Sequence, residues 1–213
     1  MRKPVLVILF AALLVPAVTD AADWIARLRV IEVSPNDSSS TILDTGTGVT
    51  VDSATTVEVD ITMMLSETWG LELIAATTKH DLTTSGGDLG GASAGSVKVL
   101  PPTLTLQYHF PTNGGWHPYL GAGINFTLFY DYELSSDLEG LGVSGIEFDN
   151  SFGFAGDLGV DIDLSDTWLL NLDVKYILID TAAELELAGG GFLDTVDVDI
   201  DPWVFGVGIG IRF

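Results

Sequence analysis

The sequence predicts an all-β protein, an eight-stranded antiparallel transmembrane β-barrel with long extracellular loops and short periplasmic turns. Three observations favour this fold. The last eleven residues alternate strictly between apolar and small or polar side chains. After the N-terminal stretch, no continuous apolar run approaches the length of a membrane-spanning helix. Connections between the apolar segments alternate between long and short, as in barrels of the outer-membrane type.

The C-terminal stretch shows the pattern most clearly. One face carries only apolar side chains: Trp203, Phe205, Val207, Ile209, Ile211 and Phe213. The other face carries Val204, three glycines and Arg212. Successive side chains of a strand point to opposite faces, so one face of this strand is wholly apolar. Its length suits a tilted strand that crosses the hydrocarbon core, and aromatic residues at both ends suit the two interfaces.

The N-terminus predicts a secretory signal peptide. Met1-Arg2-Lys3 precedes an uncharged, largely apolar run from Pro4 to Val18, and small residues follow. We expect residues 1–21 to be the signal peptide, with cleavage near Ala21 or Ala22, and residues 22–213 to form one barrel domain. The chain has no cysteine and a formal charge of −22. Without cysteine there is no thiolate chemistry, and such an acidic surface repels nucleic acid.

Four predicted strands lie in the first half of the chain. The first, 24–34, places Trp24, Leu28 and Val30 opposite Arg27 and Arg29. A long polar loop, 35–54, precedes a strand at 57–65 in which Val, Ile, Met and Leu alternate with Thr, Glu and Asp. A tight turn at 66–68 leads to a strand at 69–76, and a Gly/Ser-rich loop at 79–96 leads to a strand at 98–110. The adjacent prolines inside that fourth strand remove two hydrogen-bond donors, which predicts a bulge or a local opening.

The second half repeats this arrangement. A short turn at 111–118 precedes a strand at 120–132, and a long loop at 133–145 precedes a strand at 152–162. A tight turn at 164–167 precedes a strand at 168–178, and a fourth long loop at 181–194 leads towards the C-terminal strand. The turn sequence Ser66-Glu67-Thr68-Trp69 recurs as Ser165-Asp166-Thr167-Trp168, so both tryptophans should lie in the periplasmic aromatic girdle.

Charges of both signs occupy the face opposite the apolar one. The basic members are Arg27, Arg29, Lys175 and Arg212, and the acidic members are Glu58, Asp60, Glu72, Asp157, Asp161 and Asp173. A soluble β-sandwich or a lipocalin-like barrel would place its apolar parity inward and these charges at the surface. Aromatic residues at the strand ends argue for the membrane barrel, in which the charges pair inside a narrow lumen.

Several motifs, in order along the mature chain, resemble the OmpW family of outer-membrane proteins. They are Leu100-Pro101-Pro102-Thr103-Leu104, Pro118-Tyr119-Leu120-Gly121-Ala122-Gly123-Ile124-Asn125, Asp180-Thr181, Asp201-Pro202-Trp203-Val204-Phe205 and the final Arg212-Phe213. The resemblance implies location in the outer membrane of a Gram-negative bacterium. It also implies passive passage of small, mostly hydrophobic molecules through a narrow, partly apolar lumen, with lateral exit through the wall.

Two lumen positions follow from the resemblance. The apolar lumen residue of the third strand falls on Ile74, and the bulky aromatic that narrows the lumen falls on Lys175, where this chain departs from the family pattern. With Glu72, Asn171 and Asp173, these residues form the predicted lumen and constriction. The alternative is that they pair as a plug, because eight-stranded barrels are just wide enough for side chains to fill. Pro101 and Pro102 are the candidate lateral gate, with a simple bulge as the alternative.

Other functions receive weaker support. His80-Asp81 is the one neighbouring His–carboxylate pair that could act as an acid–base unit, but no nucleophile motif accompanies it, so we predict no enzyme. The aspartates at 194, 197, 199 and 201 lack a calcium-loop spacing, so no metal or other cofactor is expected. Expected partners are outer-membrane lipid, small hydrophobic solutes and the barrel-assembly machinery, through the strand ending in Phe213. The alternative functions are a plugged structural barrel or receptor/adhesion protein acting through acidic loops, and a small cation-selective pore.

Overall fold

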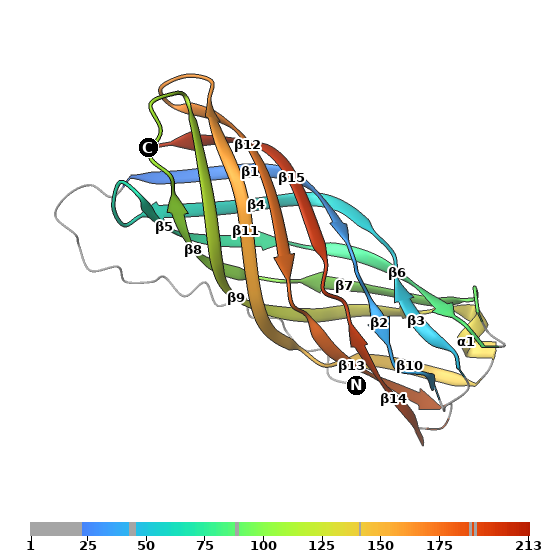
Figure 1. Ribbon diagram of the computed structural model, residues 1–213. Coiled ribbons are helices and arrows are strands. Elements are labelled where there is room, and N and C mark those ends of the chain that lie inside the picture. The colour runs from blue at the N-terminus through green and yellow to red at the C-terminus, as the bar shows by residue number, and fades with distance from the viewer. Residues whose placement is uncertain (1–22, 43–45, 88–89, 141, 188, 190) are drawn as a thin grey trace.

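The computed structural model describes residues 23–213 except 43–45, 88–89, 141, 188 and 190. The predicted signal peptide lies outside these residues. The described chain forms a long barrel built almost wholly of β-strands (Figure 1). Its described helical segment, α1 (Ser136–Gly140), is five residues long, and no described helix is long and apolar enough to cross a membrane.

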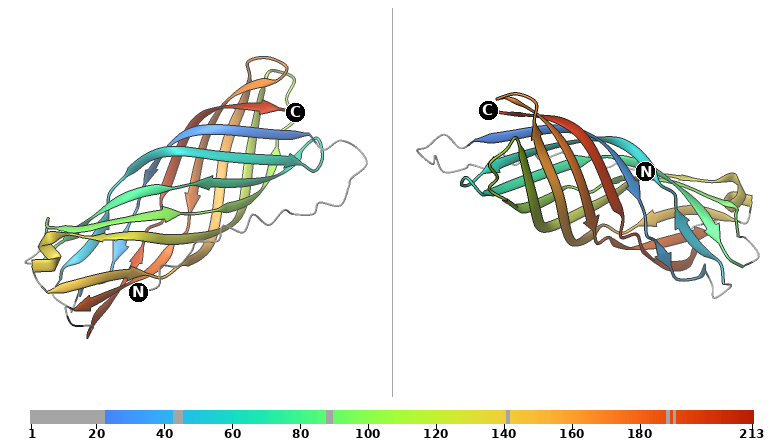
Figure 2. Two further views of the ribbon diagram at one scale, coloured as in Figure 1. Left: turned by 180° about the vertical axis from the view of Figure 1, so that it is seen from behind. Right: turned by 45° about the horizontal axis from the view of Figure 1, so that its top comes forward.

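Eight antiparallel strands close the membrane-spanning part of the barrel, which confirms the predicted fold (Figure 2). Around the barrel they are β1 (Trp24–Ser34), β4 (Ala54–Met64), β5 (Trp69–Ala76), β8 (Thr103–His109), β9 (Trp116–Leu134), β11 (Ser151–Asp163), β12 (Trp168–Ile177) and β15 (Trp203–Arg212). The last strand pairs with the first, and the backbones of Trp24 and Phe213 exchange two hydrogen bonds. Closure leaves no unpaired edge in the spanning part, as a bilayer requires.

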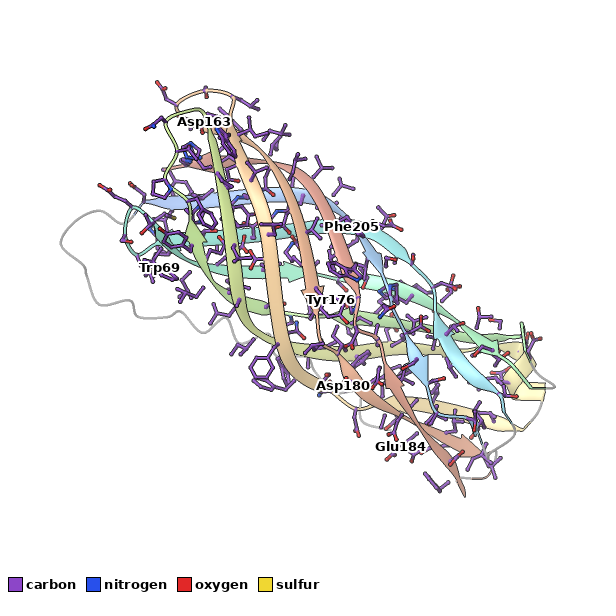
Figure 3. The ribbon with its side chains drawn as sticks, viewed as in Figure 1. Trp69, Asp163, Tyr176, Asp180, Glu184 and Phe205 are labelled. Atoms are coloured by element: carbon purple, nitrogen blue, oxygen red, sulfur yellow. The ribbon has the colours of Figure 1, made fainter. Side chains whose placement is uncertain are left out.

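Short turns connect the strands at the periplasmic end. The two recurring turn sequences adopt the same conformation, because Ser66 Oγ accepts a hydrogen bond from the Trp69 N–H as Ser165 Oγ does from the Trp168 N–H. Both tryptophans face outward, and Figure 3 shows Trp69 near this end of the barrel. A second aromatic level lies further along the barrel, where the rings of Tyr176 and Trp203 lie 4.8 Å apart. The two levels match the aromatic belts of a membrane barrel.

The predicted long loops are largely strands, so the predicted strand lengths were too short. Extracellular strands are β2 (Ser38–Ser39), β3 (Gly48–Val51), β6 (Thr78–Ser85), β7 (Ser93–Leu100), β10 (Val143–Phe148), β13 (Asp180–Leu187) and β14 (Gly191–Asp199). They continue the wall beyond the membrane as two sheets. One contains β3, β6, β7 and the outer part of β9, and the other contains β10, β13, β14 and β2. The polar, glycine-rich composition of these segments concealed their alternation.

The membrane-spanning and extracellular parts of the wall have opposite patterns of polarity. The inner face is polar in the first and apolar in the second, and the outer face shows the reverse. Along β12 and β13 the inward positions change from polar Asp173 and Lys175 to apolar Ile177 and Ile179. The outward positions change from apolar residues, ending at Leu178, to acidic Asp180 and Glu184. Figure 3 shows Tyr176, Asp180 and Glu184 in this order along the barrel. The outward change marks the membrane surface, and the lumen becomes apolar at about the same level.

Candidate functional site: a charged plug beneath an apolar vestibule

Two arginines from β1 hold the centre of the membrane-spanning lumen. Arg27 binds both carboxylate oxygens of Asp161, with Nε–Oδ1 and Nη2–Oδ2 distances of 3.0 and 2.6 Å, and its Nη1 lies 3.0 Å from Asp60 Oδ1. Arg29 Nη1 lies 2.9 Å from Glu58 Oε1, and its Nη2 lies 3.1 Å from Glu72 Oε1. These side chains are almost completely buried. Burial of charge requires partners of this kind, and the bidentate arginine–carboxylate pair is the strongest geometry.

Tyr119 extends this network to the opposite wall. Its hydroxyl donates to Asp173 Oδ2 at 2.8 Å and accepts from Asn171 Nδ2 at 3.0 Å. Gln107 Nε2 donates to both Glu72 Oε2 and Asp157 Oδ2 at 2.7 Å. We call the whole set the charged plug: Arg27, Arg29, Glu58, Asp60, Glu72, Gln107, Tyr119, Asp157, Asp161, Asn171, Asp173 and Lys175. These side chains from many strands fill the lumen across the membrane.

Lys175 and Glu58 form the outer surface of the charged plug. Lys175 Nζ lies 2.7 Å from Glu58 Oε1 and 2.5 Å from Asp173 Oδ1. The lysine therefore sits between two carboxylates with its charge fully paired. Arg212 was predicted to join the lumen charges but pairs with Asp163 at the periplasmic end, with an Nη1–Oδ1 distance of 2.5 Å.

An apolar vestibule lies directly above the plug. Its lining residues are mostly buried hydrophobic side chains: Ile31, Val33, Val51, Ile74, Ala76, Leu82, Val97, Val99, Pro101, Phe129, Phe148, Ile177, Ile179, Ile200, Pro202 and Val204. Glu58 and Lys175 are its charged members, and Thr78, His80 and Thr103 are its other polar members. The free space between these side chains is about 40 Å³. Since one water needs about 10–15 Å³ by this measure, the vestibule has room for about three waters and is too narrow for a larger solute in this conformation.

The wall of the vestibule has a gap in its hydrogen bonding beside Pro101 and Pro102. The pairing of β5 with β8 ends at Ile74 and Thr103, and that of β6 with β7 begins at Thr78 and Val99. Within the described chain, residues 75–77 therefore have no ladder pairing towards the prolines. On the other side the wall is continuous, because Pro102 accepts a hydrogen bond from the backbone of Phe126 at 3.1 Å. The predicted fourth strand is thus interrupted at the two prolines.

His80 occupies a polar position in the apolar wall. Its Nδ1 lies 2.7 Å from the carbonyl oxygen of Asp52, which can only accept, so Nδ1 carries the hydrogen. Nε2 then accepts from Thr78 Oγ1 at 2.8 Å. Burial lowers the pKa of His80 below its usual value. Asp81 points out to solvent, so the considered His80–Asp81 acid–base pair does not form.

The acidic row considered for calcium belongs mainly to β14. Asp197 and Asp199 point outward from this strand, and Asp199 lies opposite Asp180 on β13. In the part of the chain that the structure describes, no group of three or more His, Cys, Asp or Glu side chains is arranged to hold a metal ion. The row lies on an exposed acidic face of the extracellular sheet.

The predicted lumen residues fall on two levels. Glu72, Asn171 and Asp173 lie in the charged plug, Ile74 lines the apolar vestibule, and Lys175 belongs to both. Two features of the lumen were not predicted. The first is Tyr119, although it lies in the same alternating row as the inward-facing Gly121, Gly123 and Asn125. The second is the group of apolar residues that face inward from the extracellular strands. They recur at every second position, as Val49 and Val51 do, so this alternation was visible within the segments predicted as loops.

The sequence profile of the OmpW family matches residues 20–213. Outer membrane protein W of Vibrio cholerae is 38% identical over 194 residues, which cover 90% of this chain and 88% of that protein. The crystal structure of OprG from Pseudomonas aeruginosa superposes with a TM-score of 0.84 at 38% identity, covering 91% of this chain and 96% of that one. The dibenzothiophene metabolism operon protein PahQ of Pseudomonas aeruginosa is 24% identical over 206 residues, 93% of this chain and 92% of its own.

The family match spans nearly the whole chain, and these relatives and the barrel fold agree with it. They confirm the predicted location in the outer membrane. The chain belongs to the OmpW family of outer-membrane β-barrel proteins.

Proposed function

We propose that this protein lets small, mostly hydrophobic molecules pass from outside the cell into the outer membrane through the apolar vestibule and out through the wall gap. The observation that carries this proposal is the reversal of the lumen lining. An apolar lumen begins at about the level where the outer wall becomes acidic, and the charged plug lies directly beneath it. An apolar solute gains by leaving water for the vestibule, but loses by entering the buried ion pairs.

Lateral exit follows from where the wall lacks hydrogen bonds. Separating two paired strands breaks a row of backbone bonds, whereas residues 75–77 have none to break towards Pro101 and Pro102. Proline has no backbone N–H, so Pro101 and Pro102 cannot donate the two hydrogen bonds that would help to close the gap. Because the vestibule is tightly filled at rest, passage requires its side chains and this part of the wall to move apart. A relative's name refers to an operon for dibenzothiophene, an apolar aromatic, which is consistent with such solutes.

A reversible cross-link tests the path. The paired register ends at Ile74 and Thr103, and one further step along each strand reaches Ala75 and Pro102. Cysteine is absent from the natural chain, so the double variant Ala75→Cys/Pro102→Cys is designed to form one disulfide across the gap. The matched control is Leu73→Cys/Leu104→Cys, at a position where the strands are already paired. Uptake of a small apolar compound into liposomes, compared with small polar and charged ones, is measured with each variant oxidised and reduced.

We expect oxidation to lower apolar uptake across the gap and to leave the control unchanged. Equal uptake by the oxidised and reduced gap variant would refute lateral exit. Faster uptake of cations than of apolar compounds would instead indicate a small cation-selective pore. No uptake of any solute would indicate a plugged barrel that acts through its acidic extracellular surface as a receptor or adhesion protein.

A further inference from the structure

The floor of the apolar vestibule carries an uneven set of charges. The charged plug contains three cationic side chains, Arg27, Arg29 and Lys175, and six carboxylates. The formal excess is therefore three negative charges in a buried lumen. Of the plug's charged residues, Glu58 and Lys175 line the vestibule. A solute that reaches the floor meets this pair first.

Glu58 is the member of the pair that can accept a further hydrogen bond. Its two cationic partners, Lys175 Nζ at 2.7 Å and Arg29 Nη1 at 2.9 Å, both contact Oε1. Among the described residues, Oε2 accepts no hydrogen bond, since both hydrogen bonds of the Glu58 carboxylate are to Oε1. Lys175 is in the opposite situation, since its ammonium already lies between the carboxylates of Glu58 and Asp173. The floor therefore offers an acceptor oxygen, and Lys175, the one cation of the plug that lines the vestibule, is already paired with two carboxylates.

The position of Glu58 makes this oxygen selective. The side chain is almost completely buried, and the surrounding lining is apolar, with Ile74, Ala76 and Val204 among its members. In such surroundings a charge-assisted hydrogen bond is stronger than in water. A carboxylate head would add a further negative charge to the excess already present. An ammonium head would reduce that excess and would pair with Glu58 Oε2.

We propose that the vestibule prefers small apolar solutes that end in an amine, with Glu58 as the residue that recognises the ammonium group and Lys175 as the residue that limits its strength. This proposal rests on the proposed function, because it assigns the solute class of the same vestibule. It distinguishes amines from neutral apolar compounds and from apolar carboxylates.

The test uses three probes with one body: 2-phenylethylamine, 2-phenylethanol and 3-phenylpropanoate. Binding at pH 7 is measured by equilibrium dialysis against the mature protein in phosphatidylcholine nanodiscs, with empty nanodiscs subtracted. We expect the wild type to bind the amine at least about tenfold more tightly than the carboxylate, the size of effect that one charge-assisted hydrogen bond provides. Glu58→Gln should reduce this ratio to about one to three and change phenylethanol binding much less than amine binding, because a neutral hydroxyl gains less from a carboxylate than an ammonium does.

Two further variants complete the design. Lys175→Met removes the competing cation and should raise the amine-to-carboxylate ratio, so the proposal stays testable if Glu58→Gln fails to fold. Glu184→Gln removes the same charge from the exposed face of β13 and should leave the ratio unchanged. Folding is checked by the mobility difference between heated and unheated samples. A ratio that is the same in wild type, Glu58→Gln and Lys175→Met, with phenylethanol still bound, would refute amine recognition alone. Absence of binding by all three probes would refute the proposed function as well.

Discussion

The composition of the charged plug predicts that removing a basic side chain lowers the free energy of unfolding more than removing an acidic one. Arg27→Met removes the one cationic partner of Asp161 among the described residues, and one of the two arginines that pair with Asp60 and Glu72, in a lumen with more acidic than basic side chains. Leaving buried charges without a partner costs about 3–5 kcal/mol in the free energy of unfolding. Asp161→Asn removes one negative charge from a plug with six carboxylates and three cations, while Arg27 keeps its contacts with Asp60 and Glu72. We expect it to cost about 1–2 kcal/mol, the range for one weakened hydrogen-bonded contact.

The assay is equilibrium unfolding in urea, followed by tryptophan fluorescence in lipid vesicles. Arg212→Met is the matched control, because its ion pair with Asp163 is partly solvent-exposed, with side chains 29% and 30% exposed. Exposed pairs contribute about 0–1 kcal/mol, so this variant should change stability little. In the double variant Arg27→Met/Asp161→Asn, the loss should be smaller than the sum of the single losses. A larger loss for Asp161→Asn than for Arg27→Met would refute the assignment of excess negative charge to the plug.

Three other predictions address the wall, the vestibule and the N-terminus. Gly208→Ala should prevent folding, because its Cβ would lie 2.2 Å from the Leu28 carbonyl oxygen. Gly156→Ala should fold, because the nearest atom to its Cβ, the Gly121 carbonyl oxygen, would lie 3.8 Å away. Comparable yields of heat-modifiable protein from the two variants would contradict this prediction. Burial lowers the pKa of His80, so the unfolded chain binds a proton at this residue more readily than the folded chain does. The free energy of unfolding should therefore fall as the pH drops through about 6.5. Urea midpoints at pH 7.5 and 5.5 should show that His80→Gln reduces this difference, and an unchanged difference would assign it to other groups. The mass of the protein purified from outer membranes should correspond to cleavage near Ala21 or Ala22, and retention of residues 1–20 would disprove the signal peptide.

The membrane-facing half of the fold could be read from the sequence because the lipid imposes a simple rule. Every second residue of a spanning strand must be apolar, and the row ending in Phe213 obeys it without exception. The same rule placed Glu72, Asn171, Asp173 and Lys175 inside the lumen by parity. Their individual partners were not predictable, because residues far apart in sequence, such as Arg27 and Asp161, meet only when the barrel closes.

The extracellular half was misread because the rule changes there. Outside the membrane, the outward positions are polar and the inward ones apolar, so Val196 and Val198 alternate with Thr195 and Asp197. Among many glycines and serines, such short alternations resemble loops. The vestibule was therefore missed, although one predicted lumen residue, Ile74, proved to line it.

The sequence by itself determined the all-β class, the eight spanning strands and the side of the wall that the residues of those spanning strands face, because alternation and the length of the hydrocarbon core are local constraints. Only the tertiary structure decided which charges pair, where the lumen changes from polar to apolar, and that Glu58 keeps an unpaired oxygen beneath the vestibule. These features depend on how opposite walls approach each other, and that distance is set by the closure of the whole barrel.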